Sequence, residues 1–231
     1  MTSLIKDIKP IGWQFESCFI NISVPIVSYS FAHADKFKNE LVDIVDDIES
    51  FYLRNKPESF AEQDGETNTQ SLNTHNFRNY NIFDFNEYES INCLQQFVSE
   101  CIIHYKEQIF NFKSQPTYIQ CWSNKVERLD YLSYHYHNNL SNISSLSANY
   151  FLKCSGIETF TEYKAPSNVF DDCKIIYIDN VEGDLTIFPS FIKHKTSPVR
   201  DRFGVRYSLG MDILENQYED IKRTGCWKQI I

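Results

Sequence analysis

The hydrophobic positions in the first half of the chain follow two periods, one typical of strands and one typical of helices. Residues 19–31 (FINISVPIVSYSF) are rich in β-branched and aromatic side chains, so this segment is expected to be extended. In residues 32–55 the apolar side chains recur at helical spacing, which predicts an amphipathic helix. Its apolar stripe consists of Leu41, Ile44, Val45, Ile48, Phe51 and Tyr52. A second helix is expected over residues 86–112, where apolar residues again recur at intervals of three and four.

A polar segment separates the two expected helices. Asn55, Lys56 and Pro57 are expected to end the first helix. Residues 57–80 then show no apolar periodicity and are rich in Asn, Glu, Gln and Thr, which predicts a long loop. A loop of this length inside a compact domain is usually functional or mobile, so it is a candidate lid over a binding site.

From Pro116 onward, short β-rich runs replace the helical pattern. Eight of them follow one another without an intervening helix: TYIQCWSNKV, RLDYLSYHYH, LSANYFLK, ETFTEYK, CKIIYI, DLTIFPS, FIKHKTS and FGVRYSLGMDIL. Turn residues such as Asn138-Asn139 and Gly183-Asp184 separate many of these runs. The pattern predicts an α+β protein built on a double-stranded β-helix, or jelly roll, of about eight strands, with the N-terminal helices packed on the outer face of one sheet.

The chain is expected to form a single domain over residues 1–231, because domains rich in β structure often reach this length as one unit. In this division, residues 1–115 supply a strand, the supporting helices and the long loop. Residues 116–213 form the jelly-roll core, and residues 214–231 form a C-terminal tail.

Composition and charge narrow the classes of protein that fit. The hydrophobic content of 42% and the aromatic content of 15% are enough for a packed core, which excludes a disordered chain. The net charge of −9, without a basic stripe, argues against nucleic acid as a partner. Seven scattered cysteines without a CxxC pair favour reduced thiols over a disulfide framework. No signal-peptide pattern and no apolar stretch of about 20 residues occurs, so a soluble, cytoplasmic protein is expected.

The candidate chemistry begins at the stretch HYHNNL. His135 and His137 are separated by one residue, so a strand would place both imidazoles on one face. His194 lies on the seventh β-rich run and His135 on the second, and these two strands are neighbours in a jelly roll. Three imidazoles on one side of a metal would leave three coordination positions open, as oxygen-activating iron sites require. The alternatives are a polar histidine pair on a half-exposed strand, or a site for Zn, Ni or Cu.

A second candidate feature lies on the last β-rich run, where Arg206 and Ser208 would share one face of a strand. A guanidinium beside a hydroxyl is suited to bind a carboxylate through charge-assisted hydrogen bonds. Burying an arginine in so apolar a strand is costly unless an anion accompanies it. That anion is either a ligand or an Asp or Glu of the protein itself.

Together these motifs resemble those of the iron(II)- and 2-oxoglutarate-dependent oxygenases. The most similar pattern is that of a subgroup with Y-x-x-x-H-x-H, S-G-x-Y-Y-L, G-D-L-x-x-F-P-S-W-L-x-H and R-x-S-x-S-F-N. The corresponding segments here are Tyr131 to His137, Ser147 to Leu152, Gly183 to His194 and Arg206 to Asp212. Trp122 stands where this family tends to have a Trp at the start of the barrel. The resemblance covers residues 116–213.

The resemblance implies a cofactor set and a role for each motif residue. Fe(II) would be held by His135, His137 and His194, and 2-oxoglutarate would chelate the iron through its keto-acid end. Arg206 and Ser208 would bind the distal carboxylate of 2-oxoglutarate, with Tyr131 as a further candidate for this anion. With O2 as co-substrate, the implied reaction hydroxylates a small molecule or an amino-acid or peptide side chain and releases succinate and CO2.

Three departures from the family pattern bear on the site. Most members of the wider superfamily have HxD or HxE, whereas His137 is neutral and leaves the iron site one unit more positive. The SG of the pattern is replaced by Ser147-Ala148, and its final SFN is replaced by residues 209–212, LGMD. These changes are expected to reshape the pocket.

Two other classes of protein share parts of this pattern. A cupin-like dioxygenase with three histidines would use HxH without 2-oxoglutarate, but it would leave Arg206 and Ser208 unexplained. A non-catalytic jelly-roll binding module would carry the histidines on a polar surface. The literal HxD at His33 and Asp35 is expected to be structural, with Asp35 capping the first helix, because no strand pattern surrounds it.

Overall fold

Antiparallel strands make up most of the structure, which is a computed structural model of the 231-residue chain. The structure describes residues 4–16, 21–54, 72–73, 81–109, 116–127, 131–139, 142–143, 145–154, 159–166, 173–200, 203–215 and 227–231. The expected loop at 57–80 therefore lies outside the described residues, apart from the two-residue strand β3 (Leu72–Asn73).

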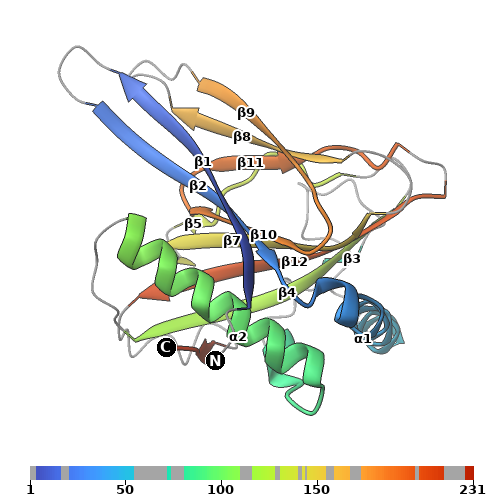
Figure 1. Cartoon of the computed structure of the whole chain (residues 1–231). Coiled ribbons are helices and arrows are strands. Elements are labelled where there is room, and N and C mark those ends of the chain that lie inside the picture. The colour runs from blue at the N-terminus through green and yellow to red at the C-terminus, as the bar shows by residue number, and fades with distance from the viewer. Residues whose placement is uncertain are drawn as a thin grey trace.

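The larger sheet has eight strands, and its central strands are β10, β7, β12 and β4 (Figure 1). Its order is β1 (Ile5–Glu16), β2 (Asn21–Phe31), β10 (Asp184–Pro189), β7 (Leu146–Cys154), β12 (Val205–Glu215), β4 (Thr117–Glu127) and β13 (Lys228–Gln229), with β3 also paired to β4. The smaller sheet has the order β11 (Lys193–Thr196), β8 (Phe160–Pro166) and β9 (Cys173–Asp179). The short strands β5 (Asn138–Asn139) and β6 (Asn142–Ile143) pair with each other.

Side chains along β12 point alternately to the two faces of the larger sheet. One face packs in the hydrophobic core beneath the helices, and the other faces the space between the two sheets. Tyr207, Leu209, Met211 and Ile213 belong to the main hydrophobic core. Because neighbouring side chains in a strand point to opposite faces, the even-numbered residues 206–212 face the other way, toward the smaller sheet. The sequence of this single strand therefore supplies both a packing face and a polar face to the site.

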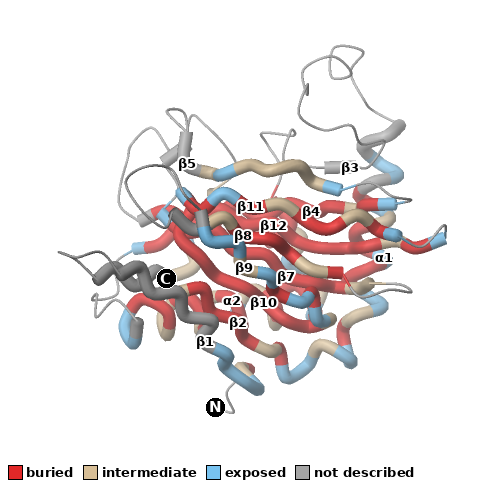
Figure 2. The backbone as a smooth tube through the Cα atoms, turned by 90° about the horizontal axis from the view of Figure 1, so that it is seen from above, coloured by how far each residue is buried: buried red, intermediate tan, exposed pale blue. Residues whose placement is uncertain are grey.

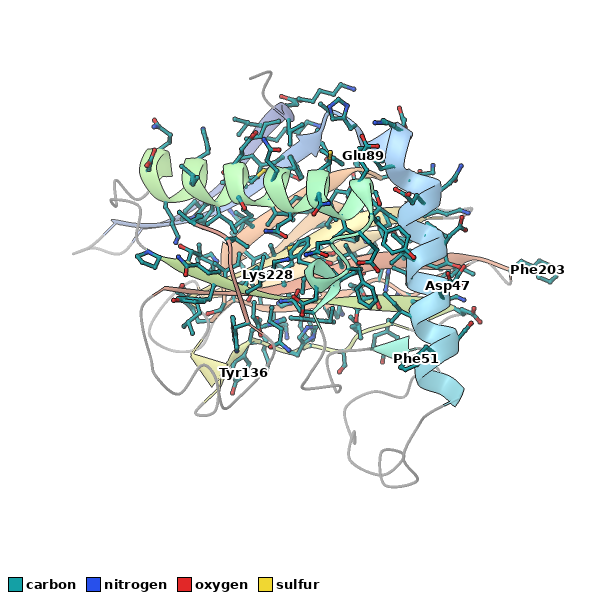
Figure 3. The ribbon with its side chains drawn as sticks, turned by 90° about the horizontal axis from the view of Figure 1, so that it is seen from below. Asp47, Phe51, Glu89, Tyr136, Phe203 and Lys228 are labelled. Atoms are coloured by element: carbon teal, nitrogen blue, oxygen red, sulfur yellow. The ribbon has the colours of Figure 1, made fainter. Side chains whose placement is uncertain are left out.

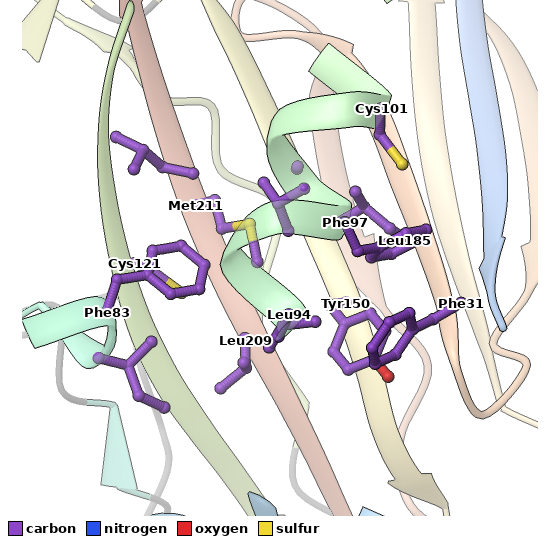
Figure 4. Close-up of a cluster of buried hydrophobic side chains, with 14 of the residues drawn as sticks. Phe31, Phe83, Leu94, Phe97, Cys101, Cys121, Tyr150, Leu185, Leu209 and Met211 are labelled. Atoms are coloured by element: carbon purple, nitrogen blue, oxygen red, sulfur yellow. The ribbon is translucent and has the colours of Figure 1, made fainter. Parts of the chain in front are cut away.

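The main core lies between the larger sheet and the helices. The helices are α1 (Ala34–Arg54), α2 (Glu89–His104), the 3-10 turn η3 (Ile82–Asp84) and the π-helical turn η4 (Tyr105–Ile109). Leu94, Phe97 and Cys101 on α2 are fully buried in this core, where Leu94 lies near Leu209 of β12 and Phe97 near Leu185 of β10 (Figure 4). Each fully buried side chain of this size contributes about 1.5–3 kcal/mol. The expectation that the helices cover the outer face of one sheet is confirmed.

Figure 2 shows that buried residues dominate the central strands, while exposed residues lie mainly at the ends of strands and on the outer face of the helices. A second, smaller apolar cluster lies inside the jelly roll. Its members are Ile26, Tyr163, Ile178, Phe188 and Ile192, which come from both sheets. This cluster packs the two sheets together beside the histidines described below.

The structure differs from the sequence-based expectation in two strands. The second β-rich run is not a strand in its described part, residues 131–137, which makes only an isolated bridge between His135 and His194. Its partner β11 is only four residues long, which leaves little edge for pairing. Conversely, the strand β1 was not expected, because Pro10 and Gly12 interrupt its pattern. An edge position tolerates both residues.

The first helix does not use Asp35 as its N-cap, which differs from the expectation. Since α1 starts at Ala34, Asp35 lies in the first turn rather than at the cap. A carboxylate is also favourable there, near the positive end of the helix dipole. His33 packs edge-on against Phe31 and Phe37, with ring centroids 5.9 and 6.3 Å apart. This HxD pair therefore has a structural explanation.

The thiols Cys93, Cys101, Cys121 and Cys154 are free. In the part of the chain that the structure describes, no helix combines the length and the apolar character that crossing a membrane requires.

Candidate active site

Three histidines from two separate segments meet at one point. The backbones of His135 and His194 pair in both directions, at N–O distances of 3.0 and 2.9 Å. The amide of His137 donates to the carbonyl of Ser190 at 3.1 Å, which holds the HxH segment against the end of β10. Potential ligand atoms of the three rings lie within 4.8 Å of one another. The sequence-based expectation that these histidines are neighbours is thus met in the structure.

The hydrogen bonds of the rings determine which nitrogen faces the shared point. Nδ1 of His135 lies 2.7 Å from the carbonyl oxygen of Ser133, and Nδ1 of His194 lies 3.0 Å from that of Ile192. A carbonyl oxygen only accepts, so Nδ1 carries the proton in both rings. Nδ1 of His137 lies 2.7 Å from the carboxylate of Asp212. This tautomer leaves the lone pair of each ring on Nε2, which is the nitrogen that would bind a metal.

Burial favours the neutral form of the innermost ring. His194 is 5% exposed, whereas His135 and His137 are partly exposed. Burial holds the pKa of His194 well below its usual range, and the neighbouring His135 and His137 lower it further. Since a metal binds only the neutral imidazole, this environment suits a ligand.

The donor set fits a divalent transition metal. Three imidazole nitrogens on one side of a metal leave three positions of an octahedral site for other ligands. Imidazole binds Fe, Zn, Cu and Ni, so the rings alone do not select iron.

A Trp, a Gly and an Asp enclose His137. The indole of Trp122 stacks on the imidazole, with ring centroids 5.5 Å apart and planes inclined by 24°. Gly210 pairs with Trp122 across β12 and β4, and a Cβ atom at this position would lie 2.6–2.7 Å from the indole. The carboxylate of Asp212, which is 0% exposed, lies behind the ring and also accepts from Ser147 Oγ at 3.4 Å.

Arg206 is buried without a carboxylate partner among the described ion pairs. Its side chain is 1% exposed, and it donates to Ser197 O at 2.8 Å and to Thr196 Oγ1 at 2.7 Å. Its Nε has no hydrogen-bond partner. Burial lowers the pKa of the guanidinium from its usual value to about 10. The alternative in which an Asp or Glu of the protein neutralises Arg206 is therefore not met in the described part of the chain.

Further buried polar atoms without partners line the same interior. They are the amide oxygens of Asn124 and Asn149 and the hydroxyl of Tyr163. Asn124 pairs with Ser208 and Asn149 with Gly210, so both belong to the interior-facing rows of the larger sheet. Buried polar groups are normally satisfied, and a group without a partner calls for a bound ligand or water.

Tyr163 and Thr196 lie beside the candidate site, and the sequence motifs gave neither of them a role toward iron or 2-oxoglutarate. Tyr163 pairs with His194 across β8 and β11, and the two rings stack with centroids 5.8 Å apart. Thr196 Oγ1 accepts from Arg206 and from the amide of Leu132 at 3.0 Å, so its own proton remains to be donated. A Tyr 31 residues before His194 and a Thr two residues after it form no recognisable motif in a single sequence.

Of the other expected anion-binding residues, one is buried and one is not. Ser208 is 3% exposed and lies on the same face of β12 as Arg206. Tyr131 is 44% exposed, so its side chain lies largely outside the interior that encloses Arg206. His104 is hydrogen-bonded to Tyr29 Oη at 3.1 Å and lies on α2, away from the three clustered histidines.

Residues 120–212 match the family model described as "Putative 2OG-Fe(II) oxygenase". This span contains all six residues that the sequence motifs assigned to iron or to 2-oxoglutarate. No curated protein matches the chain. The resemblance inferred from the motifs is thereby confirmed at the level of the family.

Solved structures share the fold at low identity. The non-heme alpha ketoglutarate dependent carbocyclase SnoK from nogalamycin biosynthesis aligns with a TM-score of 0.54 and 11% identity, over 82% of this chain and 79% of that chain. A Pseudomonas putida prolyl-4-hydroxylase aligns with a TM-score of 0.44 and 13% identity, over 56% and 67%. A prolyl hydroxylase from Trichoplax adhaerens gives 0.47 and 16%, over 65% of each chain. The chain thus spans about two thirds of both hydroxylases, and the alignment with SnoK confirms the jelly-roll fold.

Proposed function

We propose that this chain, whose residues 120–212 match the family model of the 2OG-Fe(II) oxygenases, hydroxylates a small molecule or an amino-acid side chain. The family implies Fe(II), 2-oxoglutarate and O2 as the cofactor set, and the three-histidine cluster is present.

The observation that carries the proposal is the pairing of two features in one interior. Potential ligand nitrogens of three imidazoles lie within 4.8 Å of one another, and a buried guanidinium without a carboxylate partner among the described ion pairs lies on β12 of the larger sheet. A metal explains the first feature and a carboxylate ligand explains the second. 2-Oxoglutarate combines a metal-chelating keto acid with a second carboxylate, so it accounts for both.

In this proposal His135, His137 and His194 hold Fe(II). Iron held there would support the oxidation of 2-oxoglutarate by O2 to succinate and CO2, in which one oxygen atom enters succinate and the other enters a C–H bond of the substrate. The protein would orient the metal and the substrate and exclude water from the site. His194 and its apolar neighbours Phe188 and Ile192 close the interior side, while the partly exposed His135 and His137 leave the opposite side open to substrate.

Arg206 is the proposed anchor for the distal carboxylate. Its Nε proton is unpaired and lies in a medium where a charge-assisted hydrogen bond contributes about 1.5–3 kcal/mol. The free proton of Thr196 and the unpaired hydroxyl of Tyr163 are further donors on the same inner face of the smaller sheet. Ser208 remains a candidate from β12, and Tyr131 is the weaker candidate because of its exposure.

The test is succinate release from 2-oxoglutarate by the purified protein in the presence of Fe(II) and O2. We expect release to stop when any one of the three is omitted, and a metabolite library should contain compounds that accelerate it. A dioxygenase that uses three histidines without 2-oxoglutarate would consume O2 and form no succinate. A binding module would retain no iron after anaerobic loading.

A further inference from the structure

We infer that Asp212 is a positioning residue for the metal centre, which orients His137 and supplies the negative charge that three neutral imidazoles lack. The inference rests on the proposed function, because it takes His137 as a metal ligand. It assigns Asp212 to the side of His137 away from the metal rather than to the metal itself.

The geometry gives Asp212 control over the ring. Its Oδ1 lies 2.7 Å from Nδ1 of His137, and it comes from β12, a central strand bonded along its length to β4 and β7. A carboxylate accepts, so it fixes the proton on Nδ1 and leaves Nε2 for the metal. Trp122 stacks on the ring and restricts its rotation. The ring is thus held by a hydrogen bond at one edge and by an indole against its plane.

The three histidines differ in the kind of acceptor that holds them. His135 and His194 donate to backbone carbonyls, which carry no net charge. His137 donates instead to a carboxylate, that of Asp212. A carboxylate behind a ligating imidazole raises the basicity of the ring, and loss of such a partner typically weakens metal binding 10- to 100-fold.

The sequence pattern indicates that charge, rather than hydrogen bonding, distinguishes this residue. In the motif that the chain otherwise resembles, R-x-S-x-S-F-N, the position of Asp212 is an Asn. An Asn could also accept from His137, but it carries no charge. Most of the wider superfamily has a carboxylate at the position of His137. In this chain the carboxylate is that of Asp212, which contacts His137 and would not contact the metal directly.

Burial makes the arrangement specific. Asp212 is 0% exposed, and a buried carboxylate is costly unless hydrogen bonds and a positive charge offset it. Ser147 donates to the same oxygen, Oδ1, at the longer distance of 3.4 Å. A divalent metal on the far side of His137 supplies the positive charge, and Asp212 in turn reduces the net charge of the centre.

The experiment is anaerobic Fe(II) titration of the parent protein and of Asp212→Asn, which preserves the shape of the side chain. We expect the dissociation constant of Fe(II) to rise 10- to 100-fold, with an unchanged circular dichroism spectrum. The matched control is Asp184→Asn, because Asp184 is also a buried carboxylate, bonded to Ser30 Oγ at 2.7 Å, and is not part of the metal cluster. This control should bind Fe(II) like the parent.

Two further measurements separate charge from orientation. Loss of a negative charge should raise the Fe(III)/Fe(II) midpoint potential of Asp212→Asn, because the ferric state depends more on the anion. The double variant His137→Asp with Asp212→Asn returns the carboxylate to the metal, and we expect it to regain most of the affinity that the single variant lost. If affinity falls but neither the potential shifts nor the double variant recovers, the charge assignment is wrong.

The outcomes also distinguish this inference from the proposed function. A parent protein that binds no Fe(II) overturns both. A parent that binds Fe(II), with His194→Ala that does not, supports the metal centre. If Asp212→Asn then binds Fe(II) as tightly as the parent and has the same potential, only the role of Asp212 is overturned.

Discussion

At the scale of single residues, the site is ordered by contacts that do not involve a metal. The Nδ1 atoms of the three histidines are held by Ser133, Ile192 and Asp212, at distances of 2.7 to 3.0 Å. The rings therefore need little rearrangement when a metal binds. Such preorganisation is what a functional site requires of its supporting residues.

The first prediction concerns the three rings. Replacing His135, His137 or His194 singly by Ala should remove most bound Fe(II), because each substitution leaves only two protein ligands. His104→Ala is the control, since His104 is bonded to Tyr29 and belongs to α2. Metal content after anaerobic loading and gel filtration is the measurement. Full iron occupancy in His137→Ala would show that His137 is not a ligand.

The second prediction concerns Arg206. In the iron-loaded protein Arg206→Ala should weaken 2-oxoglutarate binding roughly 10- to 100-fold, since each charge-assisted bond contributes about 1.5–3 kcal/mol and ~1.4 kcal/mol corresponds to a factor of ten. Arg206→Lys should restore only part of this, because an ammonium lacks the planar donor pair. Arg200, which is exposed, is the matched control. Equal affinity in parent and Arg206→Ala would remove Arg206 from the 2-oxoglutarate site.

At the scale of elements, the pairing of β4 with β12 shapes the wall behind His137. Trp122 and Gly210 are directly opposite in this pair, and the absent side chain of Gly210 makes room for the indole. The family pattern has a Ser at this position. Two residues that stand where the pattern has SFN line this wall: Gly210 lies against Trp122, and Asp212 contacts His137.

The third prediction tests this wall. Gly210→Ala would place a Cβ atom 2.6–2.7 Å from the indole of Trp122, so the ring must shift away from its place against His137. We expect a loss of about 1–3 kcal/mol in unfolding free energy, as is usual for overpacked cores, together with weaker Fe(II) binding. Trp122→Phe in the same chain should relieve the overlap and restore much of the stability. Urea unfolding and anaerobic titration are the two measurements.

A second glycine provides the contrast. Gly183 has φ of +86° in the turn before β10, and a Cβ atom there would lie 2.5 Å from that of Ala34 at the start of α1. Gly183→Ala should therefore destabilise the fold by at least about 1 kcal/mol. The overlap would be with Ala34 at the start of α1 and not with a residue that contacts His137, so Fe(II) affinity of the folded fraction should be unchanged. An equal loss of affinity in both glycine variants would mean that the effect of Gly210→Ala is one of general stability.

The sequence predicted the elements whose signals are local and repeated. The stripe from Leu41 to Ile48 and the β-rich runs around Ile187 and Leu209 became α1, β10 and β12. The histidines were found because HxH and a distal His form a spaced motif. Tyr163, Thr196 and Asp212 could not be assigned in this way, since their roles depend on which strands become neighbours. Contacts between residues 30 to 75 positions apart produce no periodic pattern in a single sequence.

At the scale of the whole molecule, the site joins the two sheets. His194 and Tyr163 belong to the smaller sheet, and Arg206 and Asp212 belong to β12 of the larger one. The isolated bridge at His135 connects the HxH segment to β11. Ligands bound between these groups should therefore stabilise the fold as a unit.

The fourth prediction follows from this linkage. A ligand that binds only the folded state stabilises it by about 2.7 kcal/mol at 100 times its dissociation constant. For a chain of this size, that corresponds to a rise in Tm of about 5–10 °C. Fe(II) should raise Tm alone, and 2-oxoglutarate should add a second rise only when the metal is present. Arg206→Ala should keep the first rise and lose most of the second, whereas His194→Ala should lose both.

The most direct test of the central claim is anaerobic calorimetric titration of 2-oxoglutarate into the protein, with and without Fe(II). Three histidines and Arg206 in one interior predict one 2-oxoglutarate per chain, bound at least about tenfold more tightly when iron is present, because the keto acid then chelates the metal. Succinate, which retains the carboxylate but not the keto acid, should gain little from the metal. Equal binding with and without Fe(II), or no binding by a protein that retains iron, would contradict the account and favour a three-histidine dioxygenase that does not use 2-oxoglutarate.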